Sequence, residues 1–165
     1  MSGLLRNLLT LLTAWPRYGS CAPHATVASS YRVTPLDTGI TTLKSDRYLQ
    51  IAESAQVDFL LNTGLMGGLL KQRIQFVNLA QMVRFGKAVR LFDKLQVDTR
   101  VAFADGKCAY FSHSFSVGGE PRAQVLVKMK FKQGRITVPP QQVLGAFSGD
   151  KPAQLQHWDD SLQAF

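Results

Sequence analysis

The sequence has few cysteines and little charge for its length. Only two of its 165 residues are cysteine, Cys21 and Cys108, and no CxxC pair brings two thiols together. We therefore expect no zinc site and no redox pair, and two free thiols, although a disulfide between them stays open. Charged residues make up 18% of the chain and hydrophobic residues 45%, which is typical of a globular domain and excludes a disordered chain.

The positive charge is spread along the chain rather than gathered in one dense run. Lysine and arginine number 19 against 11 aspartates and glutamates, which gives a formal net charge of +8. Such a charge suits nucleic acid, anionic lipid or a phosphate-bearing ligand, and it is equally typical of a basic soluble protein. No RNA- or DNA-binding motif accompanies the basic residues, so we expect no nucleic-acid partner.

The sequence also lacks a hydrophobic run long enough to cross a bilayer. Its most apolar stretch is a leucine-rich segment near the N-terminus, which Arg6 interrupts. A signal peptide would fit the alanines that follow, but not the absence of Lys and Arg before the stretch. We predict instead an amphipathic helix over residues 3–14, which packs on its own domain or a dimer mate, or lies on a membrane surface. Its apolar side consists of leucines at helical spacing, Leu4, Leu8 and Leu11, widened by Leu5, Leu9 and Leu12.

A second helix is predicted in the first half of the chain. A linker rich in Pro, Gly, Ser and Ala precedes it, followed by a strand over residues 30–34 and a loop over residues 36–44. Ser45 is a suitable N-cap for a helix that begins near Asp46, and Gly64 is a suitable C-terminal cap after Asn62. A short helix over residues 65–72 follows. The apolar face of the longer helix is formed by Tyr48, Ile51, Ala52, Ala55, Phe59 and Asn62.

The second half of the chain predicts an antiparallel sheet. Residues 76–85 are apolar enough for a strand buried on both faces, and residues 95–103, 109–117 and 123–131 alternate between apolar and polar side chains. Asp105-Gly106 and Gly118-Gly119 are hairpin turn signals between them. The sequence thus predicts an α+β domain in which four strands form a meander, and the curved antiparallel sheet wraps around the long central helix. Joining two sheets edge to edge in a dimer would cover the free edge.

Several motifs in this order resemble the hotdog-fold thioesterases of the 4-hydroxybenzoyl-CoA thioesterase type. The likeness covers about residues 31–143, and its pieces are Arg47-Tyr48-Leu49 followed by Glu53, residues 58–65, residues 89–95 and residues 123–128. The resemblance implies a hotdog fold and a cytoplasmic hydrolase of lipid metabolism that acts on acyl-CoA or acyl-carrier-protein thioesters. It implies a homodimer or a dimer of dimers, and neither a metal nor a cofactor besides the coenzyme A thioester as substrate. We divide the chain into an N-terminal helix and linker (1–29), a thioesterase-like domain (30–147) and a peripheral C-terminal tail (148–165).

The active-site loop departs from the pattern of that family. The family's loop has Asp, three residues, His, one residue, two Asn, two residues and Tyr. With Tyr48 as the anchor, Thr42 stands at the His position, and Lys44 and Ser45 stand at the two Asn positions. The Asp position falls on Thr38, one residue after Asp37.

Two carboxylates are candidates for directing water at a thioester. Asp37 precedes the loop, where the alternative is a turn with Thr38 and Gly39. Glu53 lies one turn into the helix beyond Tyr48, where the alternative is a solvated or ion-paired side chain. The backbone N–H groups around Lys44, Ser45 and Asp46 are the expected oxyanion donors, because the first turn of a helix leaves such donors free.

Substrate binding is assigned to an aromatic residue and a basic turn. Tyr48 lies at the start of the helix, and Arg84, Lys87 and Arg90 flank Gly86, where hotdog enzymes place basic groups for nucleotide phosphates. A solvated charged turn is the alternative for the three basic residues. His113 is expected to be a satisfied core histidine, and the remaining apolar side chains are expected in the core first and in an acyl pocket second: Phe111, Phe115 and Met129.

Three functions remain open from the sequence. The first is thioester hydrolysis by Asp37 or Glu53. The second is a hotdog protein that binds an acyl group or a partner without catalysis, which the Thr-Thr-Leu-Lys loop of residues 41–44 allows. The third is a peripheral membrane or assembly module that uses residues 3–14, which would add membrane association to a cytoplasmic location.

Overall fold

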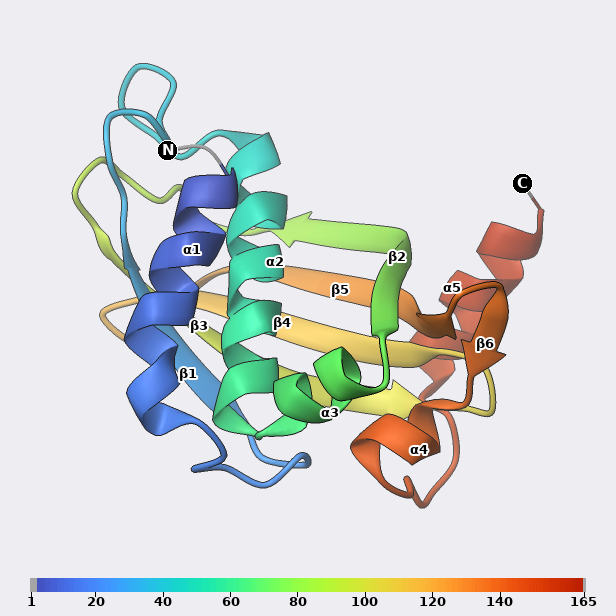
Figure 1. Ribbon diagram of the computed structural model, residues 1–165. Helices are drawn as coiled ribbons and strands as arrows, with labels where there is room; N and C mark the ends of the chain where they lie inside the picture. Colours follow the sequence, from blue (N-terminus) through green and yellow to red (C-terminus); the bar gives the residue numbers. More distant parts are fainter. Residues whose placement is uncertain (1–2, 165) are drawn as a thin grey trace.

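A curled antiparallel sheet wraps around helix α2 in the computed structural model, which describes residues 3–164, with side chains from residue 7 onward (Figure 1). The helices are α1 (Gly3–Ala14), the 3-10 helix η1 (Trp15–Arg17), α2 (Ser45–Asn62), α3 (Leu65–Lys71), α4 (Pro140–Leu144) and α5 (Ala153–Gln163). The strands are β1 (Val27–Arg32), β2 (Ile74–Phe85), β3 (Lys94–Ala104), β4 (Ala109–Val117), β5 (Glu120–Gln133) and β6 (Ile136–Val138). The expected architecture, a curved sheet around a long helix, is confirmed.

The strand order corrects part of the predicted topology. The sheet runs β1-β3-β4-β5-β2, with β6 pairing β5. Strands β3, β4 and β5 form the expected meander, because the two predicted turns close hairpins between them. The predicted four-strand meander is wrong at β2, which pairs with β5, while β1 takes the place beside β3. A connection over residues 86–93 carries the chain from one edge of the sheet toward the other.

The core lies between α2 and the concave face of the sheet. Side chains at helical spacing on α2, such as Ile51 and Phe59, are buried against alternate residues of the strands. The rings of Phe59 and Phe111 meet edge to face with centroids 5.4 Å apart, an arrangement that favours tight packing. The helix ends as predicted, because Gly64 adopts the left-handed conformation (φ 73°) that a glycine tolerates without strain.

Three local expectations are corrected by the structure. The first strand begins at Val27 rather than residue 30. The helix begins at Ser45, and its N-cap is Lys44 rather than Ser45. Strand β2 is not buried on both faces, because it is the last strand in the order and most of its side chains are partly or fully exposed.

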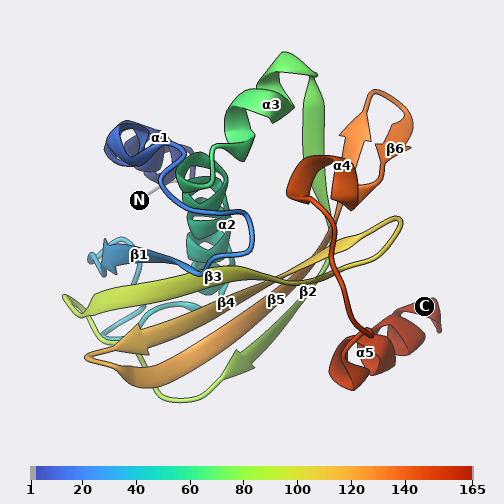
Figure 2. The same cartoon turned by 90° about the horizontal axis from the view of Figure 1, so that it is seen from below.

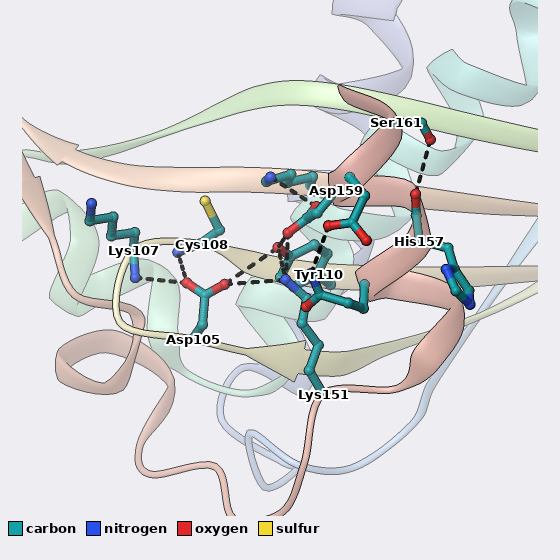
Figure 3. A network of polar contacts seen from close by, with 11 residues as sticks. Asp105, Lys107, Cys108, Tyr110, Lys151, His157, Asp159 and Ser161 are labelled. Atoms are coloured by element: carbon teal, nitrogen blue, oxygen red, sulfur yellow. Dashed lines mark hydrogen bonds and ion pairs between the residues drawn. The ribbon is translucent and has the colours of Figure 1, made fainter. Parts of the chain in front are cut away.

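The C-terminal tail packs on the face of the sheet opposite to α2 (Figure 2). Leu155 and Trp158 of α5 are buried there against Tyr110 and Leu126. Around them, Asp159 accepts a hydrogen bond from the Tyr110 hydroxyl at 2.5 Å and pairs with Lys128 at 2.9 Å and with Lys151 (Figure 3). Residues 148–164 are therefore an integral layer of the protein rather than a peripheral tail.

Helix α1 lies beside α2 and above β1 (Figure 2), and its observed range agrees with the predicted 3–14. Its contact with α2 is made by Thr10 and Ala14, both buried, and by Asn7, whose Oδ1 accepts a hydrogen bond from Ser54 Oγ at 2.7 Å. Leu8, Leu9, Leu11 and Leu12 are exposed, so the expectation that the leucines pack on the domain is wrong for these four. The side chains of Leu4 and Leu5 lie outside the described residues.

Within the part of the chain that the structure describes, none of the helices is long and apolar enough to span a bilayer.

Candidate functional site

The loop before α2 holds Asp37 in a buried position close to the start of the helix. Asp37 is 1% exposed, and its Oδ2 accepts hydrogen bonds from Thr34 N at 3.0 Å and Thr34 Oγ1 at 2.6 Å. Its main-chain oxygen accepts a hydrogen bond from Lys44 N at 3.1 Å. Because Lys44 is the N-cap of α2, this bond fixes Asp37 beside the first turn of the helix.

A second segment holds the far side of the same loop. Leu43 N donates to Val89 O at 2.9 Å, and Leu91 N donates to Thr41 O at 3.0 Å. An isolated bridge joins Thr42 to Arg90. The structure therefore brings the backbone of Arg90 next to the loop.

The first turn of α2 presents backbone N–H groups. Among the described residues, no side chain caps this end of the helix. Ser45 and Asp46 are exposed, and the carboxylate of Asp46 lies 3.8 Å from Nε of Arg47. The N-terminus of a helix carries partial positive charge, so N–H groups placed here favour a negatively charged oxygen atom. The turn lies beside the loop that holds Asp37, whose main-chain oxygen is bonded to Lys44 N.

Tyr48 packs in the interior next to this turn. Its side chain is buried, and its ring lies 5.2 Å from that of Phe85 and 5.4 Å from that of Phe115, centroid to centroid. Burial raises the pKa of Tyr48, and a backbone hydrogen bond at Val89 opposes the rise. Tyr48 thus contacts the segment around Val89 that holds the loop, and its side chain packs in the interior beside the loop.

The other candidate residues are dispersed. Glu53 is exposed and lies eight residues into α2, roughly 12 Å along the helix from Ser45. Lys87 pairs with Glu120, which also lies 2.9 Å from Arg122. Arg84 lines a groove of about 570 Å³ with Asp98 and Ser114. Because Asp98 and Ser114 alternate with inward-facing residues, this groove lies on the convex face, across the sheet from α2.

The interior beneath α2 contains fully buried polar side chains, His113, Thr99 and Gln56 among them. His113 Nδ1 and Thr99 Oγ1 share a hydrogen bond of 2.9 Å. Burial lowers the pKa of His113 to about 3, so the ring is neutral at pH 7. Gln56 donates to the sulfur of Met129 at 3.2 Å. His113 is a core histidine, as expected, but it is not fully satisfied, because its Nε2 has no hydrogen-bond partner among the described residues. Phe111, Phe115 and Met129 are all in the core, with 1% exposure or less.

Sequence reasoning missed the residues that hold the loop. Thr34 is the partner of the Asp37 carboxylate, and Val89 and Leu91 hold the opposite side. The three-residue spacing of Thr34 and Asp37 was a usable signal, because a Thr or Asp side chain commonly bonds backbone groups two to four residues away. The contact with residues 89–91 joins distant parts of the chain and had no local signal. Cys21 and Cys108 are both free thiols.

A family model matches this chain over most of its length. The model describes the thioesterase-like superfamily and matches residues 38–147. The matched range begins at the loop beside Asp37 and ends after α4, so it includes the helix, strands β2 to β6 and the segment that holds the loop.

Solved structures with the same fold include several thioesterases. A probable thioesterase from Bartonella henselae is 20% identical, with a TM-score of 0.61, 70% of this chain covered and 98% of that chain. A gentisyl-coenzyme A thioesterase is 19% identical, with a TM-score of 0.64 and coverages of 73% and 100%. A Staphylococcus aureus protein in complex with CoA is 14% identical, with a TM-score of 0.65 and coverages of 81% and 94%. At these identities the likeness establishes the hotdog fold.

Proposed function

This chain belongs to the thioesterase-like superfamily, and from that premise we propose that it hydrolyses acyl-CoA or acyl-carrier-protein thioesters at the N-terminal end of α2. The observation that carries the proposal is the position of Asp37, a buried carboxylate bonded through its main chain to the N-cap of a helix whose first turn no described side chain caps. Hydrolysis needs both of these groups, a carboxylate and oxyanion donors.

In the proposed reaction, the thioester carbonyl lies between Asp37 and the first turn of α2. The Asp37 carboxylate either takes a proton from an attacking water or attacks the carbonyl carbon itself, and water then releases the acyl group. The backbone N–H groups of Ser45 and Asp46 stabilise the negative oxygen that forms in either case. The carbon–sulfur bond breaks, the thiolate takes up a proton, and the products are a carboxylate and a free thiol.

Asp37 is better supported than Glu53 as the reacting carboxylate. Glu53 is exposed and about two helical turns away from the oxyanion donors of its own chain. It would act only if a second copy placed a substrate against it. A homodimer through β2 is the assembly we propose, because β2 ends the strand order and exposes Val77, Leu79 and Phe85.

Arg90 is the basic residue that we propose for the phosphates of the carrier. It is exposed and its backbone bridges Thr42 of the loop. Lys87 is neutralised by Glu120, and Arg84 faces the convex side, so both are placed less well for this role. Two of the similar structures support a coenzyme A thioester as the ligand. The Staphylococcus aureus protein is in complex with CoA, and the other is named a gentisyl-coenzyme A thioesterase. A cytoplasmic location stays a prediction, and membrane contact through residues 3–14 would involve another surface.

The test is hydrolysis of a panel of acyl-CoA and acyl-carrier-protein thioesters by the full chain. Asp37→Asn should lower kcat/KM by about 10²–10⁴-fold, the usual range for a lost acid–base group. Asp160→Asn is the control, because this exposed carboxylate lies on α5, across the sheet from α2, and should be dispensable. A loss in Glu53→Gln but not in Asp37→Asn would transfer the role to Glu53. Circular dichroism would show that each variant is folded.

The second candidate is a hotdog protein that binds thioesters without hydrolysing them. The observation that favours it is the loop, where Thr42, Lys44 and Ser45 stand at the family's His and Asn positions. Calorimetric binding of an acyl-CoA by the unmodified chain, with no turnover of any member of the panel, would establish this alternative.

A further inference from the structure

Helix α1 turns the four leucines whose side chains are described toward solvent. The side chains that it places against α2 are small or polar, namely Thr10, Ala14 and Asn7. Leu8 is 52% exposed and Leu12 is 66% exposed, and Leu9 and Leu11 are also exposed. A water-exposed helix that packs on its own domain normally buries its apolar side, so this arrangement leaves an apolar surface that needs a partner.

The exposed surface continues past the end of α1. Trp15 is 68% exposed, and its ring lies 6.0 Å from that of Tyr18, centroid to centroid. The Tyr18 hydroxyl donates to Gly64 O at 2.8 Å and accepts from Gly67 N at 3.0 Å, so the aromatic pair is fixed against α3. We call these six residues the N-terminal apolar face: Leu8, Leu9, Leu11, Leu12, Trp15 and Tyr18.

The segments around this face carry more positive than negative charge. Residues 1–36 contain three arginines and no aspartate or glutamate, and Lys71 and Arg73 lie at the end of α3. The neighbouring helix α2 contributes two exposed acids, Asp46 and Glu53. Arg17 lies 3.6 Å from Asp58, yet its side chain remains 52% exposed. An apolar face among cations is the pattern that binds anionic lipid, in which cations meet the headgroups and leucines enter the acyl boundary.

The position of α1 argues against a second copy as the partner. It lies above β1, at one end of the strand order, whereas the exposed edge strand β2 is at the other end (Figure 2). A dimer that pairs through β2 would leave the N-terminal apolar face uncovered. At 12 residues, α1 is about 18 Å long, against about 30 Å for the hydrocarbon core of a bilayer, so it suits a helix that lies in the plane of the interface.

We propose that the N-terminal apolar face docks this protein on the surface of an anionic lipid bilayer. Trp15 lies at the level of the headgroups, where its ring contacts apolar chains and its indole N–H stays hydrated. The ring of Tyr18 lies beside it, while the Tyr18 hydroxyl stays bonded to Gly64 and Gly67. The leucines of α1 enter the outer part of the acyl region. Docking does not depend on hydrolysis. It keeps the whole protein at the membrane surface, and the loop beside Asp37 with it.

Co-sedimentation of the full chain with vesicles tests this docking. Vesicles of phosphatidylcholine mixed with phosphatidylglycerol should bind the protein, and the double variant Leu8→Glu/Leu12→Glu should weaken binding by at least about tenfold, because both charges would enter the acyl boundary. Ile136→Glu is the matched control, since Ile136 is a similarly exposed apolar residue (70%) on β6 and should leave binding unchanged. Equal binding by the double variant, or no binding by the unmodified chain, would overturn the proposal.

Fluorescence of Trp15 identifies the surface that meets the lipid. In a Trp158→Phe variant, Trp15 is the only tryptophan, and its emission should shift to shorter wavelength on the mixed vesicles and be quenched by brominated lipid. Unchanged emission from sedimented protein would refute docking through this face. Light scattering without vesicles completes the test: a drop in molar mass caused by Leu8→Glu/Leu12→Glu would show that the face is instead a contact between copies of the chain.

Discussion

The two faces of the sheet are covered in different ways. On the concave face, α2 buries a mainly apolar layer, in which Phe59 meets Phe111 edge to face and polar side chains such as His113 and Gln56 are enclosed. On the convex face, α5 buries Leu155 and Trp158 and surrounds them with charged contacts centred on Asp159. The concave layer spans the full length of a long helix, whereas the convex layer is one short helix. We conclude that the first layer determines whether the chain folds and that the second can open while the first persists.

The largest difference between the faces should appear on truncation of Phe59. Its side chain is fully buried among groups that cannot collapse into the space, so Phe59→Ala should lower the free energy of unfolding by about 3–5 kcal/mol. Urea unfolding followed by far-UV circular dichroism measures this loss. Trp158→Ala on the convex face is the comparison and should cost less, because α5 is at the surface and can undock. A larger loss for Trp158→Ala would reverse the proposed roles of the two faces.

Acid should act on the two faces in separate pH ranges, and the concave face responds first. The pKa of His113 is about 3 in the folded protein, against about 6.5 in an unfolded chain. The His113 side chain therefore binds a proton in the unfolded chain at a higher pH than in the folded protein. The folded protein has its full stability above about pH 6.5, and the free energy of unfolding decreases as the pH falls from 6.5 toward 3. Near pH 5 the loss is on the order of 2 kcal/mol.

Replacement of His113 tests the assignment of that pH dependence. His113→Gln keeps a polar side chain beside Thr99 but cannot titrate, so its urea midpoint should change little between about pH 7 and pH 5. On the convex face, burial alone would raise the pKa of Asp159, but hydrogen bonds from Lys151, Tyr110 and Lys128 lower it to about 2. The contribution of Asp159 is therefore complete above about pH 4 and is lost only below it. The same slope in the unmodified chain and in His113→Gln would contradict the assignment.

Loss of the Asp159 carboxylate should open the convex face alone. Asp159→Ala leaves Lys128 without its anion and Lys151 with Asp105 alone, 3.7 Å away. Because both lysine side chains are partly exposed, the cost should be about 1–3 kcal/mol. Amide exchange should become faster in α5 and stay slow in α2. Asp160→Ala is the control, since Asp160 lies next on the same helix and accepts a hydrogen bond only from exposed Gln156. Faster exchange in both helices would show that the two layers open together.

The sequence predicted the concave face better than the convex face for a physical reason. Period-two alternation and the helical spacing from Tyr48 to Phe59 both report burial against one apolar layer, and α2 and the strands follow them. Tyr110 occupies a position of β4 that the alternation assigns to solvent, yet it is fully buried beneath α5. A short helix that docks through polar contacts has no periodic signal in the strand that it covers, so α5 was missed as a layer.

Parts of the candidate site also had local sequence signals, and other parts did not. Asp37 became a candidate because the resemblance places the family's Asp position one residue away, and the helix start was predicted because helix termini have local sequence signals. The role of residues 89–91 was missed because main-chain bonds to Thr41 and Leu43 depend on where β2 returns to the sheet. Arg84 and Arg90 look equivalent in sequence, but β2 turns Arg84 toward the convex groove while Arg90 bridges the loop.

The smallest expected effect connects the two faces to the proposed activity. If hydrolysis takes place beside Asp37 on the concave side, a variant that loosens α5 across the sheet should change kcat/KM by no more than about twofold, because separate sites without shared partners contribute independently. Asp159→Ala, assayed on the thioester panel at a temperature where the variant remains folded, measures this. A loss of tenfold or more would mean that the convex layer holds the loop through the sheet. The comparison between the two faces would then have to include Arg84 and Arg122, which line the groove on the convex face.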